Sequence, residues 1–326
     1  MAIQAVKLKP GINREGTRYT TEGGYYDGDK IRFRQGTPEK IGGWTRISSS
    51  TFQGVCRSLH NWVTLGGQNL IGVGTHLKFF IENVGNYNDI TPLRATVSLS
   101  NPFVTTSGST TVTVTDANGG YKNGDFVTFS SATAVGGLTL NGEFQISLGS
   151  LSAANTYTIT ASSAASSSAT GGGTVSAAYQ INVGNAFATL LSGWGASSWG
   201  SGAWNVGESS TAPVRFFTQS NFGEDLIFGH EGGRLYYWDA TNGVGTRAVE
   251  LSSRSGASDV PVVQNLILVS DISRFVFCFG TNEIGSDTID PTLLRWSDQE
   301  DATNWTPSAT NQAGSLRLSR GTKIVS

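Results

Sequence analysis

Asp225-Leu-Ile-Phe-Gly-His230 and Gly233-Arg-Leu-Tyr-Tyr-Trp-Asp239 are the two runs of sequence that decide the fold class. Each is a short, largely apolar run that ends at turn residues, which is typical of a β-strand. Arg215-Phe-Phe-Thr-Gln219 precedes them and completes a group of three strands joined by short turns. Such a group predicts one blade of a β-propeller.

Two other parts of the chain repeat this pattern. In residues 55–92, the run Asn69-Leu-Ile-Gly-Val-Gly74 corresponds to the run at Asp225 and is also followed by an aromatic-rich strand. Further apolar runs lie between residues 262 and 296. These are divergent repeats at uneven spacing, and residues 315–326 begin another strand pair. The sequence therefore predicts an all-β, propeller-like body that is incomplete within these 326 residues.

Residues 98–183 have a different composition, rich in Ser, Thr, Ala and Gly. Runs such as Thr111-Val-Thr-Val-Thr-Asp116 alternate polar and apolar residues, as half-buried strands do. The turns between them contain Asn-Gly pairs, which favour tight hairpins because both residues tolerate positive φ. We therefore predict an inserted all-β module of about six strands, a barrel or a sandwich. The low-complexity run 162–173 is expected to be a mobile loop.

The opening segment, residues 1–47, carries nine Lys and Arg against five Asp and Glu, or +4, whereas the whole chain carries −2. Ile31 and Phe33 alternate with Arg32 and Arg34, which predicts a strand with one apolar and one basic face. Pro38 is expected to block pairing just beyond that strand. The predicted domains are a docking segment (1–47), blades (48–97), the inserted module (98–183) and further blades (184–326).

The opening segment also resembles the N-terminus of the tail nozzle proteins of short-tailed bacteriophages, a family also called tail hub, tail tubular or packaged-DNA-stabilisation proteins. The resemblance covers about 45 residues at the start of the chain and is specific to phage tail structural proteins more than to nozzles. Four features carry it: Pro10-Gly11, Tyr25-Tyr26-Asp27, Lys30-Ile-Arg-Phe-Arg34 and Pro38-Glu-Lys-Ile-Gly-Gly-Trp44.

The resemblance implies a virion protein made in the host cytoplasm. Such a protein forms a homohexameric ring below the portal and adaptor, in contact with tail fibres, spikes or a needle. The ring retains packaged DNA and conducts it during ejection, without sequence-specific contacts to the DNA. Members of that family are longer, so the chain is expected to be an N-terminal portion of a longer gene product or a shortened relative.

Seven residues are candidates for protein interfaces. Arg32 and Arg34 share a strand face, where they can pair with carboxylates of a neighbour; a solvated face and contact with DNA phosphates are the alternatives. Large tryptophan side chains can fill blade or subunit contacts. The alternative is that Trp194, Trp199 and Trp204 form a platform on which sugar rings stack, which would indicate a carbohydrate-binding or receptor-binding tail module. The candidates are Arg32, Arg34, Lys40, Trp44, Trp194, Trp199 and Trp204.

The remaining motifs indicate no catalytic, metal or cofactor site. The three histidines and two cysteines lack the spacing of a metal site or a triad, and Cys278 is expected to be a buried, reduced thiol. Residues 116–125 have oxygen ligands at calcium-like spacing but no closing Glu, so a hairpin turn is expected. The run from Ser297 to Trp305 resembles the turn box of propeller sialidases, without its Gly and Asp spacing.

Composition and hydropathy add two further expectations. Charged residues make up 14% of the chain and the net charge is −2, which gives no case for nucleic-acid binding by the chain as a whole. No stretch approaches 18 apolar residues, so membrane insertion is not expected. We therefore expect a structural protein without enzymatic activity.

Overall fold

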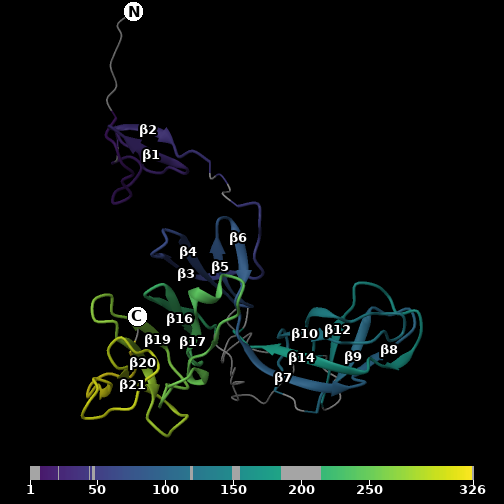
Figure 1. Ribbon diagram of the computed structural model, residues 1–326. Coiled ribbons are helices and arrows are strands. Elements are labelled where there is room, and N and C mark those ends of the chain that lie inside the picture. Colours follow the sequence, from purple (N-terminus) through teal and green to yellow (C-terminus); the bar gives the residue numbers. More distant parts are fainter. Residues whose placement is uncertain are drawn as a thin grey trace, which may run out of the picture. The chain divides into compact units, whose positions relative to one another are not determined.

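The computed structural model describes residues 8–20, 22–43, 45, 48–117, 120–148, 155–184 and 214–324. Within these residues the chain is all-β, as predicted, and its helical segments are two short 3-10 turns. These turns are η1 (Ala240–Asn242) and η2 (Leu251–Ser253). The chain divides into an N-terminal unit, Met1–Ser49, and a main unit, Ser50–Ser326 (Figure 1).

The described residues of the N-terminal unit include a β-hairpin, formed by β1 (Ile31–Arg34) and β2 (Thr37–Lys40). Gln35 and Gly36 connect the strands with φ of 51° and 80°, the positive values that a two-residue hairpin turn requires. The expectation that Pro38 blocks pairing is wrong, because Pro38 lies inside β2 opposite Phe33. In an antiparallel hairpin, hydrogen-bonded and non-hydrogen-bonded pairs alternate. Arg34 and Thr37, which flank the turn, form a hydrogen-bonded pair, so Phe33 and Pro38 form a non-hydrogen-bonded pair that needs no N–H from the proline.

Three four-stranded antiparallel sheets form the blades of the main unit, and in each the strands follow chain order. The first blade consists of β3 (Cys56–Val63), β4 (Asn69–Thr75), β5 (Phe79–Asn83) and β6 (Asn86–Asp89). The second consists of β15 (Phe217–Phe222), β16 (Asp225–His230), β17 (Tyr236–Trp238) and β18 (Val249–Glu250). The third consists of β19 (Leu266–Val269), β20 (Val276–Asn282), β21 (Ile289–Trp296) and β22 (Gly314–Arg317).

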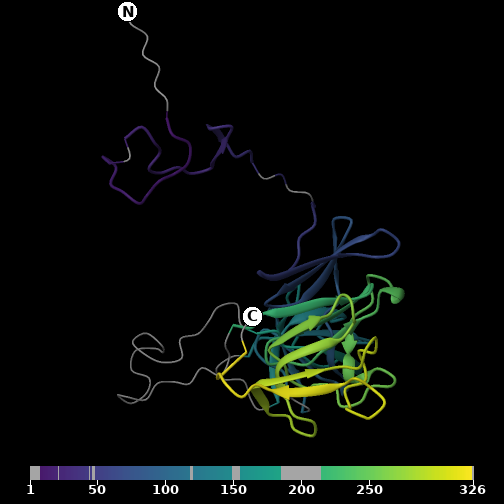
Figure 2. The same cartoon turned by 90° about the vertical axis from the view of Figure 1, so that its left-hand side faces the viewer.

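The blades stack in chain order, with β15 of the second blade in contact with both β3 and β19 (Figure 2). Leu226 and Phe228 on β16 enter a core shared with the first blade, while Ile227 enters a core shared with the third. On β17, Tyr236 and Trp238 enter the core shared with the first blade, and Tyr237 enters the core shared with the third. The second blade is thus buried on both faces, which explains why its strands read as nearly continuous apolar runs.

The inserted module is a sandwich of two four-stranded sheets rather than a closed barrel. One sheet has the order β11 (Gly142–Gln145), β10 (Phe126–Ser130), β14 (Thr174–Gln180), β7 (Leu93–Ser100). The other has the order β12 (Thr156–Thr160), β9 (Thr111–Thr115), β8 (Phe103–Thr105), β13 (Ala169–Gly171). Eight strands therefore replace the six expected, because β8 and β13 are too short to show a period.

The sandwich encloses its own apolar core, which includes Phe103, Val127 and Phe129. A buried polar chain crosses this core: the hydroxyls of Tyr157 and Tyr179 lie 2.7 Å apart, and Tyr179 donates to Asp116 Oδ2 at 2.7 Å. The predicted mobile loop at 162–173 contains β13, which pairs with β8. That expectation is therefore wrong for residues 169–171.

Candidate functional site

The basic hairpin of the N-terminal unit is the first predicted site. Arg32 and Arg34 are both exposed, on the strand face opposite the half-buried Ile31 and Phe33, so the predicted alternation is present. Arg32 Nε lies 2.5 Å from Oε1 of Glu39, its cross-strand neighbour. This pair was not foreseen, since the sequence pattern gave no reason to place Glu39 opposite Arg32.

Arg34 and Lys40 occupy different positions on the hairpin. Arg34 lies opposite Thr37, on the same face as Arg32, and makes no ion pair with any residue that the structure describes. Lys40 lies opposite Ile31 and so belongs to the apolar face of the hairpin. Arg34 is therefore the basic side chain of this face that is available to a partner carboxylate.

The four tryptophan candidates cannot be placed in this arrangement. Trp44, Trp194, Trp199 and Trp204 lie outside the described residues.

An open apolar face on the third blade is the most conspicuous surface that sequence reasoning missed. Leu268, Phe277 and Trp296 lie opposite one another on neighbouring strands, and all three are partly or largely exposed. Phe279 is in the adjacent row, and its ring centroid is 6.4 Å from that of Phe277. The full open face comprises Leu266, Leu268, Phe277, Phe279, Leu294, Trp296 and Leu316.

The other face of the same blade is fully packed. Ile267, Val276 and Cys278 point into the core shared with the second blade, and Cys278 is completely buried, as expected for a small apolar thiol. Burial raises the pKa of the Cys278 thiol. On the open face, Trp296 lies so close to Gly314 that a Cβ there would be 2.4 Å from the indole ring. Glycine at 314 therefore leaves room for the indole against β22.

A buried ion cluster joins the first blade to the sandwich. Lys78, in the turn between β4 and β5, has a side chain that is 4% exposed. Its Nζ lies 2.9 Å from Asp89 Oδ2 and 2.6 Å from Glu143 Oε1 of the sandwich. Arg247, from the segment before β18, lies 3.2 Å from Asp89 Oδ2 and completes a set of two cations and two carboxylates. The cluster therefore links the first and second blades to the inserted module.

The charges in this cluster stabilise one another. Burial acts to raise the pKa of Asp89, but a hydrogen bond from Thr91 and the two neighbouring cations hold it below its usual range. Gln180 donates to Glu143 Oε2 at 2.7 Å, and the Lys78 ammonium lies 4.6 Å from the centre of the Phe126 ring. Every charge thus has a partner, as burial of ions requires.

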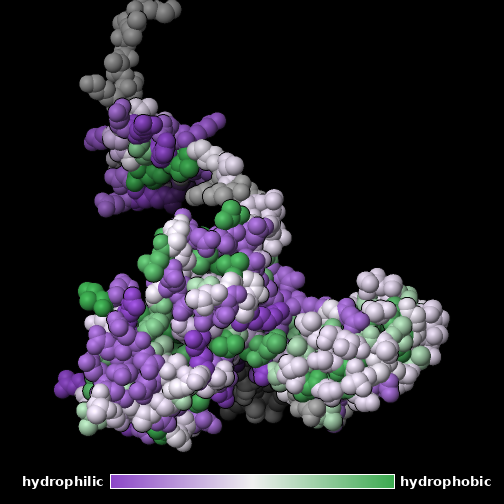
Figure 3. All heavy atoms as spheres, viewed as in Figure 1, coloured by the Kyte–Doolittle hydropathy of each residue, from purple (hydrophilic) through white to green (hydrophobic). Residues whose placement is uncertain are grey.

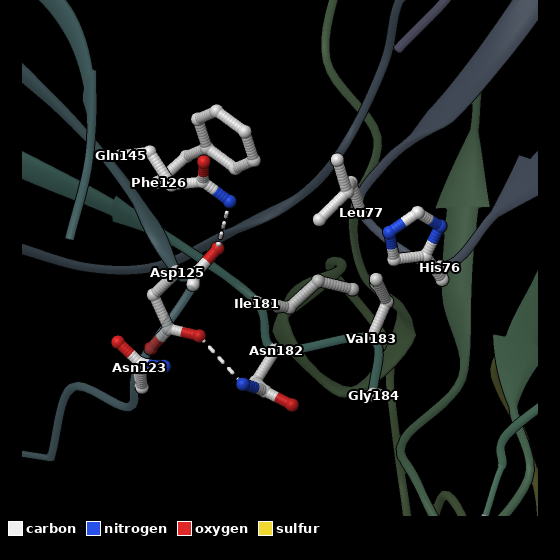
Figure 4. Close-up of a pocket in the computed structure, with 11 residues that line it drawn as sticks. His76, Leu77, Asn123, Asp125, Phe126, Gln145, Ile181, Asn182, Val183 and Gly184 are labelled. Carbon is white, nitrogen blue, oxygen red and sulfur yellow. Dashed lines mark hydrogen bonds between the residues drawn. The ribbon is translucent and has the colours of Figure 1, made fainter. Parts of the chain in front are cut away.

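A cavity of about 210 Å³ lies beside this cluster, between the first blade and the sandwich (Figure 4). Asp125 accepts hydrogen bonds from Asn182 Nδ2 at 2.6 Å and from the Lys122 backbone N–H at 2.8 Å. Burial raises the pKa of Asp125 and lowers that of His76, whose Nδ1 accepts from the Val55 N–H at 3.0 Å. The described residues around the cavity offer no pairing of a nucleophile with a base.

The two turn motifs noted in the sequence have structural roles. Asp116 and Asp125 face separate partners, Tyr179 and Asn182, rather than a shared ligand. The hairpin expected at residues 116–125 is wrong, because this segment connects β9 in one sheet of the sandwich to β10 in the other. In the run from Ser297 to Trp305, Trp305 is buried in the core of the second and third blades. Across the part of the chain that the structure describes, no cluster of three or more His, Cys, Asp or Glu could hold a metal ion.

The surface differs between the parts of the chain (Figure 3). The described residues of the N-terminal unit show a mainly hydrophilic surface, whereas the sandwich shows a pale surface of intermediate hydropathy. Among the described segments, no helix has the length and apolar character needed to cross a membrane.

No family model matches the chain, and no curated protein matches it. Among solved structures, the chain is similar to the phage phi92 endosialidase, with 16% sequence identity and a TM-score of 0.25. The alignment covers 88% of this chain and 41% of the other, so the chain spans less than half of the endosialidase's length. A TM-score this low does not establish a shared fold, and the function is therefore inferred from the chain's own residues.

Proposed function

We propose that the chain is a structural component of the tail of a short-tailed bacteriophage, and that its copies form a nozzle-like ring. The open apolar face of the third blade carries this proposal. The N-terminal segment from Pro10 to Trp44, which resembles tail nozzle proteins, supports it further. On this proposal the chain acts through assembly and has no enzymatic activity.

The open face has the properties of an interface between subunits. It is a continuous row of aromatic and aliphatic side chains on one sheet, and Leu268 and Leu316 are 52% and 53% exposed. Apolar patches of this kind mark protein–protein contacts, and buried aromatic anchors carry much of the energy of such contacts. Covering Phe277 and Trp296 would therefore favour association.

We propose that a second copy of the chain covers this face; a further blade of a longer gene product is the alternative, and the cross-linking experiment below distinguishes the two. Each blade in the stack already packs face to face against the next, through apolar residues of both sheets. The outer side of the first blade carries exposed Leu59 and Val63, which are 67% and 58% exposed. Contact between the third blade of one copy and the first blade of the next is heterologous, and repetition around a closed rotation gives a ring.

In the proposed assembly the ring has six copies and lies below the portal and adaptor, where it retains packaged DNA and conducts it during ejection. The N-terminal hairpin docks on an acidic surface of the adaptor or of a neighbouring subunit. Arg34 is suited to this contact, because it shares a face with Arg32 and has no ion pair among the described residues. Tail fibres, spikes or a needle are the further partners.

Cross-linking tests the proposed contact. We would introduce Leu59→Cys and Leu268→Cys, singly and together, in a chain that also carries Cys56→Ser, and treat assembled particles with a short bis-maleimide. A ladder of oligomers that requires both cysteines supports head-to-tail contact between the first and third blades. Dimers formed by Leu268→Cys alone, with no ladder, would contradict it.

A carbohydrate-binding tail module remains the second candidate function. The tryptophan platform on which it was first based lies outside the described residues. A different observation favours sugar binding: a cavity of about 480 Å³ between the first two blades, whose walls combine the apolar Leu70 with the hydroxyl groups of Thr64 and Thr241.

A further inference from the structure

One sheet of the sandwich ends in a long strand with an open edge. Strand β7 is the last strand of the sheet β11-β10-β14-β7, and among the described strands it pairs with β14 alone (Figure 1). It has eight residues, whereas the outer strands β11 and β13 have four and three. An open edge presents N–H and C=O groups to which a strand of another chain can bond.

The hydrogen bonds at the two ends of β7 show which of its backbone groups face this edge. The Asn101 N–H donates to the Gly173 carbonyl at 2.8 Å, and the Ile181 N–H donates to the Pro92 carbonyl at 3.1 Å. Between these ends, hydrogen-bonded and non-hydrogen-bonded pairs alternate along the register of β7 and β14, with one irregularity near Leu93. Three residues of β7 therefore turn their N–H and C=O groups outward: Thr96, Ser98 and Ser100.

These outward groups are open to a partner strand. The described residues provide no hydrogen bond to them. The side chains of the same three residues are exposed, whereas Val97 and Leu99 pack against the core of the sandwich. Proteins commonly protect a long edge strand with charged residues, proline or a bulge. Residues 95–101 include neither a charged residue nor a proline, and the irregularity near Leu93 lies outside this range.

The same edge of a second copy matches this pattern. Antiparallel pairing about Ser98 places Thr96 opposite the partner's Ser100, so that all three outward residues form hydrogen-bonded pairs. Val97 then lies opposite the partner's Leu99, and apolar side chains continue from one sandwich core to the next. No like charges meet, because Arg94 falls opposite the partner's Pro102.

We propose that two copies of the chain join through β7, in antiparallel register about Ser98, so that two four-stranded sheets become one continuous sheet. This contact is isologous, since the same strand of each copy takes part. It uses the sandwich, whereas the contact proposed for the ring uses the first and third blades. The two proposals are therefore independent.

Light scattering on the whole chain, over a range of concentrations, measures this pairing. Position 98 of one copy meets position 98 of the other at the two-fold axis. Ser98→Lys alone and Ser98→Glu alone should each weaken pairing about tenfold or more, because like charges then lie directly opposite each other. A mixture of the two variants should pair again, because unlike charges meet. Misfolding of either variant would not produce this rescue.

Ser176→Lys is the matched control. Ser176 lies opposite Ser98 on β14, so this substitution adds the same charge to the same face of the sheet, one strand away from the proposed contact. It should leave pairing unchanged.

Cysteine substitution tests the register. The Cα atoms of a hydrogen-bonded pair are about 5.5 Å apart, which suits a disulfide. In a chain that also carries Cys56→Ser, Ser98→Cys should therefore give a disulfide-linked dimer on mild oxidation. Thr96→Cys should not, because position 96 lies opposite position 100 of the partner.

Two results would overturn the proposal. A chain that is monomeric at every concentration would contradict self-pairing and leave a strand of another protein as the occupant of this edge. Oligomers of the same mass in the wild type, Ser98→Lys and Ser98→Glu would place the contact elsewhere. Neither result bears on the ring, whose test uses positions 59 and 268.

Discussion

Replacing Lys78 by methionine tests the link between the first blade and the sandwich. Methionine keeps most of the apolar length of the side chain, but it removes the ammonium that contacts Asp89 and Glu143. Removing one partner of a buried ion pair leaves an uncompensated charge and costs about 3–5 kcal/mol. The expected loss lies near the lower limit, because the two carboxylates are 23% and 27% exposed and Arg247 still neutralises Asp89.

A loss of about 3 kcal/mol corresponds to a fall in melting temperature of about 6–12 °C for a unit of this size. Urea denaturation followed by tryptophan fluorescence would measure the loss directly. Arg234→Met is the matched control, because Arg234 pairs with Glu250 at 2.7 Å but is 49% exposed. Exposed pairs contribute about 0.2–1 kcal/mol, so this control should change stability by less than 1 kcal/mol.

A double-mutant cycle separates the pair from the effects of each substitution. Lys78→Met together with Glu143→Gln should cost less than the sum of the two single changes, because the second change removes a charge that the first left unpaired. If Lys78→Met destabilises the chain no more than Arg234→Met does, the cluster does not hold the sandwich to the blades.

Three further predictions concern other parts of the chain. Burial, with the nearby charge of Arg215, lowers the pKa of His230 from 6.5 to about 4. Between these two pH values the unfolded chain binds a proton that the folded chain does not, so up to about 3 kcal/mol of stability should be lost as the pH falls from 6.5 to 4. Urea titrations across this pH range should show a smaller loss in His230→Asn. The two ends of the inserted module are adjacent, since the Ile181 N–H donates to the Pro92 carbonyl at 3.1 Å. Replacing residues 93–180 by a short Gly/Ser linker should therefore leave the blades folded, as measured by circular dichroism, and an unfolded product would contradict this prediction. Arg34→Glu should block incorporation into particles without changing the melting temperature, and normal incorporation would count against docking through this face.

The blades could be predicted from the sequence because their burial is reflected in the residues. Leu226, Ile227 and Phe228 are consecutive and buried on alternating sides of one sheet, which produces an unbroken apolar run. The inserted module was recognisable from its low charge and its alternating strands. Its Asn-Gly pairs were misleading, because Asn123-Gly124 lies in a connection between the two sheets and not in a tight hairpin. Strand β13 could not be predicted from the sequence, because it pairs with β8, which is distant in the sequence. The Thr105 hydroxyl of β8 donates to the Ser167 and Ala169 carbonyls.

The candidate sites were less predictable, since they depend on contacts between distant segments. Lys78 and Glu143 are 65 positions apart and neither belongs to a motif. The open face of the third blade shows the same apolar alternation as a buried face, so the sequence cannot distinguish a covered sheet from an uncovered one.

Electron cryomicroscopy of virions that contain this chain would test the proposed function most directly. The account predicts a sixfold ring around a central channel below the portal, with the face around Phe277 and Trp296 of each copy covered by the first blade of its neighbour. Isolated copies at the periphery of the tail, with no contact between them and no shared channel, would contradict the nozzle assignment.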